Sequence, residues 1–279
     1  MSRLIVNADD FGLTAGVNRA ILELNSAGLL TSTSLMARAA ATNQAIQAAL
    51  AAPKLRVGCH VVVADGEPVL PAGEIPTLID PITGRFPISI SSFLARLFTG
   101  RIRAEQIQSE TAAQIAFLQG RGLHLTHIDT HKHTHMFPAV LRPVLRAARA
   151  SGIHAVRNPF EPEWAVRATA GAPLARIAQV TALRWLQPVW KKIIAEEGFK
   201  TTDGTIAVVG TGVLNTPTLR SLLNSLPPGT WELVTHPGYN DADLAAVRTR
   251  LRASRDTERI ALAALKDFPQ IDLISFADL

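Results

Sequence analysis

Residues 3–28 read RLIVNADDFGLTAGVNRAILELNSAG, and they combine the two patterns from which the rest of the chain is built. The first part, Arg3–Ala8, is a short apolar run with β-branched residues, which is typical of a buried strand. The second part, residues 15–28, spaces its apolar side chains three and four residues apart, which indicates an amphipathic helix. A strand followed by a helix is the repeating unit of a parallel α/β sheet.

The same alternation continues to the end of the chain, with further helical patterns at 104–122 and 241–267. Short apolar runs between such patterns predict strands at Arg3–Ala8, Thr31–Met36, Leu55–Val63, Leu123–Asp129, Ile153–Arg157, Gly204–Val209, Trp231–Thr235 and Asp272–Phe276. An α/β chain of 279 residues with this rhythm predicts an irregular (β/α) barrel of mostly parallel strands, since such barrels typically take about 250 residues. An open, doubly wound sheet is the alternative.

Two stretches interrupt the alternation. Residues 64–100 are rich in proline and glycine and predict a long excursion between a strand and a helix. Residues 161–200 carry Trp164, Trp185 and Trp190 in a largely apolar helical pattern. Neither a repeat nor a linker divides the sequence, so we expect a single domain over residues 1–279.

The composition excludes several classes of protein. The chain is 47% hydrophobic, which suffices for a sizeable core. Its net charge is +5, but only 5% of residues are aromatic and no basic run interleaves with them, so we expect no nucleic-acid partner. A single cysteine, Cys59, excludes an internal disulfide and fits a reducing compartment. The sequence has no secretory signal and no apolar run of about 18 residues, so we expect a soluble, cytoplasmic protein.

Functional sites of parallel α/β folds form at the carboxyl ends of the strands. Five of the predicted strand ends supply carboxylates, histidines or an arginine, namely Asp9 with Asp10, then His60, then His127 with Asp129 and His131, then Arg157, and finally His236. Taken singly, most of these have an ordinary structural explanation. Asp-Asp-x-Gly is often a turn that caps a helix, a lone histidine on an apolar strand is usually a core residue, and His-Pro-Gly is a common turn.

The stretch LTHIDTHKHTHMFP at 125–138 is harder to explain in that way, since it holds four of the eight histidines. In an extended strand the odd-numbered side chains from His127 to His135 would all face one side. Histidines gathered on one face make a poor core, and the apolar residues around them disfavour a solvated loop. We therefore expect this segment to bring metal-binding or catalytic groups to a pocket.

A carboxylate and two imidazoles can hold a divalent metal and leave positions open for water and substrate. We expect one divalent ion, zinc or magnesium, with manganese and cobalt as alternatives. A further carboxylate can then serve as a base, and a histidine on the far side can protonate a leaving amine. This combination predicts amide hydrolysis. The motifs of serine hydrolases, P-loop enzymes, dinucleotide-binding proteins and HExxH metalloproteases are absent from the sequence.

Four motifs together resemble those of the YdjC-like carbohydrate deacetylases: NADDFG at 7–12, GCH at 58–60, THIDTHKHTHMFP at 126–138 and HPG at 236–238. Members of that family have an irregular (β/α) barrel and remove N-acetyl groups from amino sugars with a divalent metal. The resemblance implies that Asp10, His60 and His131 hold the metal and that Asp9 is the general base.

The remaining assignments follow from the same resemblance. The related metal-dependent polysaccharide deacetylases imply that His236 is the acid that protonates the departing amine. The residues expected to bind substrate or to support the metal ligands are His127, Asp129, His133, His135 and Arg157.

AVRNPFEPEW at 155–164, with the tryptophan-containing stretch after it, resembles the hopanoid-biosynthesis deacetylases (the HpnK branch). That branch implies an N-acetylglucosaminyl group on the lipid bacteriohopanetetrol; a chitooligosaccharide is the alternative substrate. Residues 174–196 mix Trp, Ile and Leu with Arg and Lys, as interfacial helices do. We expect them either to touch lipid at the inner face of a membrane or simply to cover the barrel, and a homodimer is compatible with both.

Two rival interpretations remain open. Metal-dependent amidohydrolases and phosphoesterases also use an HxH pair, but in amidohydrolases it ends the first strand, whereas here it lies in the middle of the chain. A metal-binding or lipid-carrying protein without enzymatic activity would also use histidines and an apolar pocket. Asp9, Asp10 and His236 would be surplus in such a protein.

Overall fold

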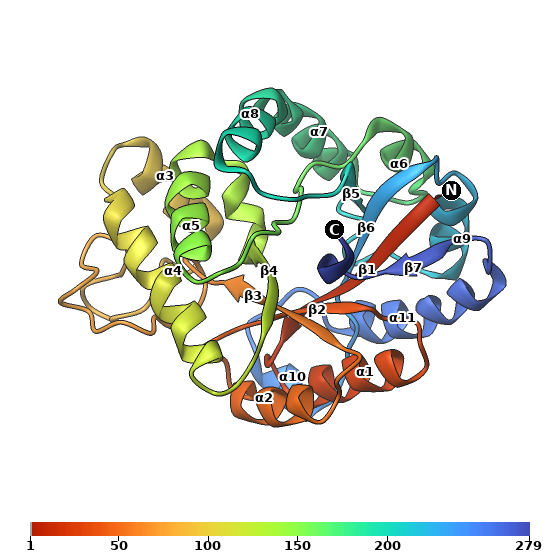
Figure 1. Cartoon of the computed structure of the whole chain (residues 1–279), viewed down its shortest axis with the longest axis horizontal. Helices are drawn as coiled ribbons and strands as arrows, with labels where there is room; N and C mark the ends of the chain where they lie inside the picture. The colour runs from red at the N-terminus through yellow and green to blue at the C-terminus, as the bar shows by residue number, and fades with distance from the viewer. Residues whose placement is uncertain (1) are drawn as a thin grey trace.

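The computed structural model describes residues 2–279. A parallel sheet curls into a partly closed barrel, and the α-helices lie outside it (Figure 1). The strands are β1 (Ser2–Phe11), β2 (Ser32–Leu35), β3 (Arg56–Val61), β4 (Leu125–Thr130), β5 (Gly204–Ile206), β6 (Gly229–Thr235) and β7 (Asp272–Ile274). Their order is β4-β3-β2-β1-β6-β5, and β7 pairs with Arg3–Ile5 of β1. The predicted irregular (β/α) barrel is confirmed.

The strand predicted at Ile153–Arg157 is wrong as a full strand. This segment makes only single bridges, from Val156 to Ile128 of β4 and from Ala155 to Lys200. The amide of Ile128 donates to the carbonyl of Ala155 at 3.0 Å, and the amide of Val156 donates to the carbonyl of Lys200 at 2.9 Å. The ladder goes no further because Pro159 has no amide hydrogen to continue it. These bridges nevertheless span the gap between β4 and β5.

β5 is also shorter than the predicted Gly204–Val209. It ends at Ile206 because Ala207 takes a left-handed φ of 70°, which a strand cannot accommodate. The helical pattern at 241–267 is divided into three pieces rather than one helix, since Val247 and Arg252 leave helical geometry.

The helices follow the strands in chain order. They are α1 (Ala15–Ser26), α2 (Thr42–Leu50), α3 (Ile90–Phe98), α4 (Ala104–Gln119), α5 (Pro138–Ala150), α6 (Glu163–Ala168), α7 (Leu174–Leu183), α8 (Gln187–Glu197), α9 (Thr216–Asn224), α10 (Ala242–Ala246) and α11 (Ala253–Ala261), with 3-10 turns η1 (His131–Met136), η2 (Arg184–Leu186), η3 (Leu262–Asp267) and η4 (Phe276–Asp278). None of the helices within residues 2–279 has the length and apolar character needed to cross a bilayer.

β1 is the centre of the sheet and positions the site. Its residues Leu4, Ile5 and Val6 are all fully buried, as expected for a parallel strand that is covered on both faces. β1 pairs with β2 near the start of the chain and with β6 and β7 near its end. The two ends of the sequence therefore belong to one sheet, and the carboxyl end of β1 opens into the mouth of the barrel.

The two irregular stretches take different forms. Residues 64–100 form a long loop that ends in α3, and the buried carboxylate of Glu110 in α4 anchors it by accepting the amides of Val69 and Leu70 at 2.8 and 3.0 Å. Residues 161–200 contain α6, α7, η2 and α8.

Candidate active site

An irregularity in β1 brings two adjacent carboxylates to the same place. The pairing of β1 with β2 shifts register between Ala8 and Phe11, and Asp10 takes a left-handed φ of 64°. Neighbouring side chains of a regular strand point to opposite faces, and a bulge redirects them. Asp9 therefore points to Arg157 while Asp10 points to two histidines, and both carboxylates are buried.

Asp10, His60 and His131 converge on one point. Asp10 Oδ1 lies 3.6 Å from His60 Nε2 and 3.4 Å from His131 Nδ1, and the two nitrogens are 3.2 Å apart. Ligand atoms about 2.0–2.1 Å from a tetrahedral ion stand about 3.3–3.4 Å from one another. This triangle of one oxygen and two nitrogens therefore has the size that a divalent ion requires.

The charge state of Asp10 also fits a cation. Its Oδ1 is buried and has no hydrogen-bond partner among residues 2–279, which would cost about 1–3 kcal/mol if it stayed unsatisfied. Its Oδ2 accepts a hydrogen bond from Arg255. Burial alone would raise the pKa of Asp10, but the Arg255 guanidinium holds it well below its usual value. Asp10 is thus an ionised carboxylate with one oxygen free for a metal.

A second group, Asp9 with His60 and Asp129, also lies close enough to surround an ion. Its oxygens already have partners, however. Both oxygens of Asp9 accept from Arg157, at 2.8 and 2.6 Å. Those of Asp129 accept from His60 at 2.8 Å and from Ser34 at 2.9 Å. The triangle of Asp10, His60 and His131 is therefore the better metal site.

Asp129 orients His60. Nδ1 of His60 donates to Asp129 Oδ1, so Nε2 faces Asp10 and His131. A carboxylate behind a histidine ligand is a common arrangement in metal sites, because it selects the tautomer and holds the ring. The structure thus places Asp129 where it holds the ring of His60.

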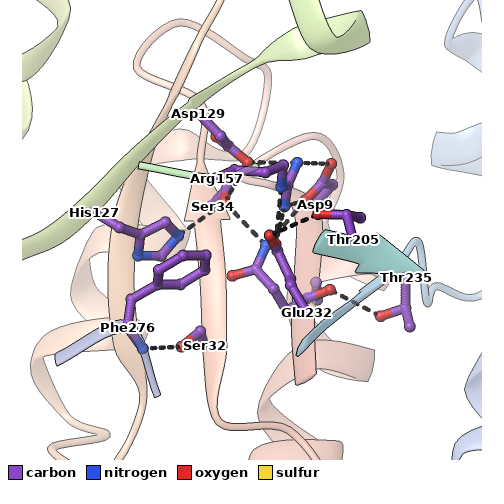
Figure 2. A network of polar contacts seen from close by, with 12 residues as sticks. Asp9, Ser32, Ser34, His127, Asp129, Arg157, Thr205, Glu232, Thr235 and Phe276 are labelled. Carbon is purple, nitrogen blue, oxygen red and sulfur yellow. Dashed lines mark hydrogen bonds and ion pairs between the residues drawn. The ribbon is translucent and has the colours of Figure 1, made fainter. Parts of the chain in front are cut away.

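Arg157 lies fully buried among three carboxylates, as Figure 2 shows. Its guanidinium contacts Asp9 at 2.6 Å, Asp129 at 2.6 Å and Glu232 of β6 at 2.7 Å. Burial would raise the pKa of Asp9, but Arg157 lowers it, so Asp9 is ionised. Burial raises the pKa of Glu232 to about 7 despite the same guanidinium. Arg157 therefore holds Asp9 in place rather than pointing into open space.

His127 lies behind the site and not in it. Its ring stacks on Phe276 with the centroids 3.9 Å apart, and Nε2 is 3.2 Å from the hydroxyl of Ser34, which in turn donates to Asp129 (Figure 2). Burial lowers the pKa of His127 to about 3, so the ring is neutral.

Gly58→Ala is expected to destabilise the protein and to disturb this support. A Cβ at residue 58 would lie 2.4 Å from His127 Nε2, closer than any real contact. Overpacking of this kind costs about 1–3 kcal/mol in the free energy of unfolding, which urea denaturation would measure. The matched control is Gly73→Ala, where the new Cβ meets no atom within 4 Å. Equal stabilities for the two variants would contradict this role of Gly58.

The predicted single face from His127 to His135 is wrong beyond Thr130. The partner strand β3 ends at Val61, opposite Thr130, so no ladder holds the following residues extended. The chain turns through left-handed φ values of 59° at Lys132 and 53° at His133 into η1. This turn places His131 beside His60 and separates the last two histidines from the metal triangle.

The last two histidines of the run have different surroundings. His135 is buried, with Nδ1 at 2.8 Å from the Thr130 hydroxyl and Nε2 at 3.1 Å from the carbonyl oxygen of Arg157, and it steadies the backbone that carries Arg157. His133 Nδ1 has no hydrogen-bond partner within the described chain. Burial lowers the pKa of His133 to about 3, so it offers a neutral imidazole.

His236 follows β6 and lies on the other side of Asp9. Its Nε2 is 3.9 Å from Asp9 Oδ2, its Nδ1 is 3.8 Å from Glu258, and its backbone amide donates to the same carboxylate at 2.6 Å. Burial would lower the pKa of His236, but Glu258 raises it above its usual value. The imidazole therefore stays protonated to higher pH than a free histidine, as a proton donor must.

The sequence reasoning missed three buried charged residues of this site, Glu232, Arg255 and Glu258. Glu232 leaves a signal, because it is a carboxylate inside the apolar strand WELVT. Arg255 and Glu258 lie on α11, whose polar residues look like an ordinary solvated face. Nothing in the sequence pattern of α11 shows that these two side chains are buried.

Comparisons with known proteins identify relatives of this chain. Residues 3–267 match the sequence pattern described as YdjC-like protein. A carbohydrate deacetylase of Thermoanaerobacter pseudethanolicus is 30% identical over 262 residues, which cover 93% of this chain and 90% of that protein. A carbohydrate deacetylase of Halalkalibacterium halodurans is 34% identical over 210 residues, covering 74% and 83% of the two chains.

Solved structures show the same fold. The crystal structure of a "putative cellobiose-phosphate cleavage protein" from Enterococcus faecalis superimposes with a TM-score of 0.80 over 99% of this chain and 98% of that one. The two sequences are 23% identical, so this likeness concerns the fold alone.

Proposed function

The chain belongs to the YdjC-like protein family, and from this premise we propose that it is a metal-dependent carbohydrate deacetylase. It would remove the N-acetyl group from an N-acetylglucosamine moiety by hydrolysing the amide bond. The observation that carries the proposal is the triangle of Asp10, His60 and His131, with Asp9 on one side and His236 beyond it. Relatives named carbohydrate deacetylase support the choice of substrate class.

Asp10, His60 and His131 would hold the ion. When bound, a divalent ion polarises the acetamide carbonyl and lowers the pKa of a nearby water. The rest of the chemistry belongs to side chains of this chain. Arg157 and Asn7 hold the Asp9 carboxylate ionised and fixed in orientation, by hydrogen bonds of 2.6–3.0 Å.

Asp9 and His236 divide the proton transfers. Asp9 takes a proton from the attacking water as its oxygen adds to the carbonyl carbon. Protonated His236 gives its proton to the amide nitrogen, the carbon–nitrogen bond breaks, and acetate and the free amine leave. His236 Nε2 and Asp9 Oδ2 lie 3.9 Å apart, beyond direct hydrogen-bond reach, so the spent base would return its proton to the spent acid through one water after each turnover.

His131→Ala is expected to remove both metal binding and turnover. His131 is the most exposed of the three ligands, with 20% of its side chain accessible, so the variant should fold normally. Loss of a residue that only hydrogen-bonds to a metal ligand weakens metal binding about 10–100-fold. Loss of the ligand itself should weaken it more. Calorimetric titration with zinc and an assay for acetate release would measure the two effects.

The matched control is His124→Ala, which removes an exposed histidine just before β4. We expect wild-type affinity and turnover from it. Full metal affinity in His131→Ala would contradict the assignment of this ligand.

For the substrate, we propose an N-acetylglucosaminyl hopanoid, with a chitooligosaccharide as the alternative. The motif AVRNPFEPEW and the apolar stretch after it support the lipid-linked sugar. A lipid-linked substrate lies in a membrane, so the proposal includes peripheral contact with one. Acetate release from N-acetylglucosaminyl-bacteriohopanetetrol and from diacetylchitobiose, measured side by side, separates the two. Release from diacetylchitobiose alone would keep the deacetylase and remove the hopanoid.

A further inference from the structure

Helix α7 buries none of its residues, although it is largely apolar. Leu174 at its start is 83% exposed, and Trp185 in the following turn η2 is 72% exposed. The solvent side of a surface helix is normally polar, and its apolar side faces the core. α7 therefore departs from the rule that the other long helices of the protein follow.

The exposed apolar residues form a stripe. They recur every three or four positions, at Leu174, Ala178, Ala182, Trp185 and Val189, and all five are exposed. That spacing places Leu174, Ala178 and Ala182 along one side of α7, and Trp185 in η2 and Val189 in α8 follow them along the chain. We call these five residues the apolar stripe. Contiguous exposed apolar surface of this kind commonly marks an interaction site.

The charge around the apolar stripe is mainly positive. Residues 164–195 contain five basic residues and no Asp or Glu, and the basic ones are Arg167, Arg176, Arg184, Lys191 and Lys192. Arg167 is paired with Glu163 at the edge of this segment, whereas Arg184 reaches the same carboxylate only at 4.0 Å and Lys192 reaches Glu196 at 3.9 Å. An apolar stripe flanked by cations is complementary to a surface with an apolar interior and anionic head groups.

The surface ends where α8 begins to pack. Trp190, Ile193 and Ile194 are buried, and the indole of Trp190 donates to the carbonyl of His135 at 3.2 Å. The segment 174–196 is thus divided: its first half buries almost nothing, whereas its second half covers the barrel with one face and leaves Val189, Lys191 and Lys192 exposed on the other.

α7 also lies at the end of the barrel that carries the active site. The guanidinium of Arg176 donates to the carbonyl of Thr211, in the loop that follows β5 at its carboxyl end. In Figure 1, α7 lies at the periphery of the molecule, beside α8 and outside the strands. A surface that held α7 would therefore be next to the mouth of the barrel.

We propose that the apolar stripe docks the protein on an anionic phospholipid bilayer. The stripe would enter the head-group boundary with Trp185 as its largest side chain, while Arg184, Lys191 and Lys192 contact lipid phosphates. The docking itself needs no assumption about catalysis. Its further consequence, that the barrel mouth is brought to a lipid-linked amino sugar, rests on the proposed function.

The test is co-sedimentation of the full-length protein with vesicles of phosphatidylcholine alone and of phosphatidylcholine mixed with phosphatidylglycerol. We expect binding to the anionic vesicles only, weakened by salt. The double variant Leu174→Ser/Trp185→Ser should lower vesicle affinity at least about tenfold, since both apolar anchors are lost. The matched control is Ile82→Ser, which removes a 93% exposed apolar side chain from the 64–100 loop, and it should bind like the wild type.

Failure of wild-type protein to bind anionic vesicles would overturn the proposal. Equal losses in the double variant and in Ile82→Ser would also overturn it, as would a homodimer in sedimentation velocity that the double variant dissociates. Acetate release from detergent-dispersed N-acetylglucosaminyl-bacteriohopanetetrol and from diacetylchitobiose, measured without vesicles, keeps this result separate from the catalytic one. Vesicle binding by a protein that releases acetate from neither substrate would leave the docking surface standing and remove the proposed function.

Discussion

Asp9→Asn is expected to lower kcat by about 10²–10⁴-fold while the protein stays folded and keeps its affinity for metal. Asparagine has the shape of aspartate but cannot accept the proton of water. Arg157 keeps two carboxylate partners, Asp129 and Glu232, so its charge remains compensated. The metal triangle does not include Asp9, so calorimetric titration with zinc should give the wild-type affinity.

The matched control for this change is Asp80→Asn, which removes a carboxylate from an exposed turn in the 64–100 loop. It should leave kcat unchanged. A kcat near the wild-type value in Asp9→Asn would remove Asp9 from the role of base. A loss of metal affinity would instead show that Asp9 belongs to the ion's ligands.

Arg157→Ala is expected to give the largest loss of stability of any single substitution at the site. It leaves Asp9, Asp129 and Glu232 buried together without their common cation. Removal of one member of a buried charge network costs about 3–5 kcal/mol, because the remaining charges stay desolvated. The free energy of unfolding of a typical domain is only about 5–15 kcal/mol, so this is a large part of it. Urea denaturation followed by circular dichroism would measure it.

Arg142→Ala is the control for Arg157→Ala. Arg142 also contacts two carboxylates, those of Glu196 and Glu197, but its side chain is 43% exposed. Exposed ion pairs contribute about 0–1 kcal/mol, so the control should stay close to the wild type. Similar losses of unfolding free energy for the two variants would contradict the role of Arg157 as the buried cation that holds Asp9 in place.

Most of the fold could be predicted from the sequence, because apolar residues are spaced differently in strands and in helices. Leu4, Ile5 and Val6 form a continuous apolar run because β1 is buried on both faces. The failures lie where tertiary contacts decide. Residues 153–157 have the composition of a strand, but their neighbour Lys200 offers only one bridging residue. The pattern at 241–267 is helical throughout, yet the chain leaves helical geometry at Val247 so that α11 can turn its charges inward.

The three proposed metal ligands could be named from the sequence, because they stand at strand ends and match motifs of the YdjC-like deacetylases. The geometry of the triangle that they form could not be predicted, because it depends on two departures from regular structure. Asp10 reaches the site through its left-handed conformation, and His131 through the turn that follows Thr130. Both departures arise where a partner strand shifts or ends, which is a property of the assembled sheet. Arg255 could not be recognised for the same reason, since its position on α11 matters only once the folded chain brings it to Asp10 at the end of β1.

The most direct test of the account is acetate release from an N-acetylglucosaminyl substrate by protein stripped of metal with a chelator and then titrated with zinc, manganese, cobalt or magnesium. The account predicts that stripped protein releases no acetate and that activity returns with one ion per chain, in the wild type but not in His131→Ala. Undiminished release from the stripped protein, or no release from protein with the ion bound, would contradict it.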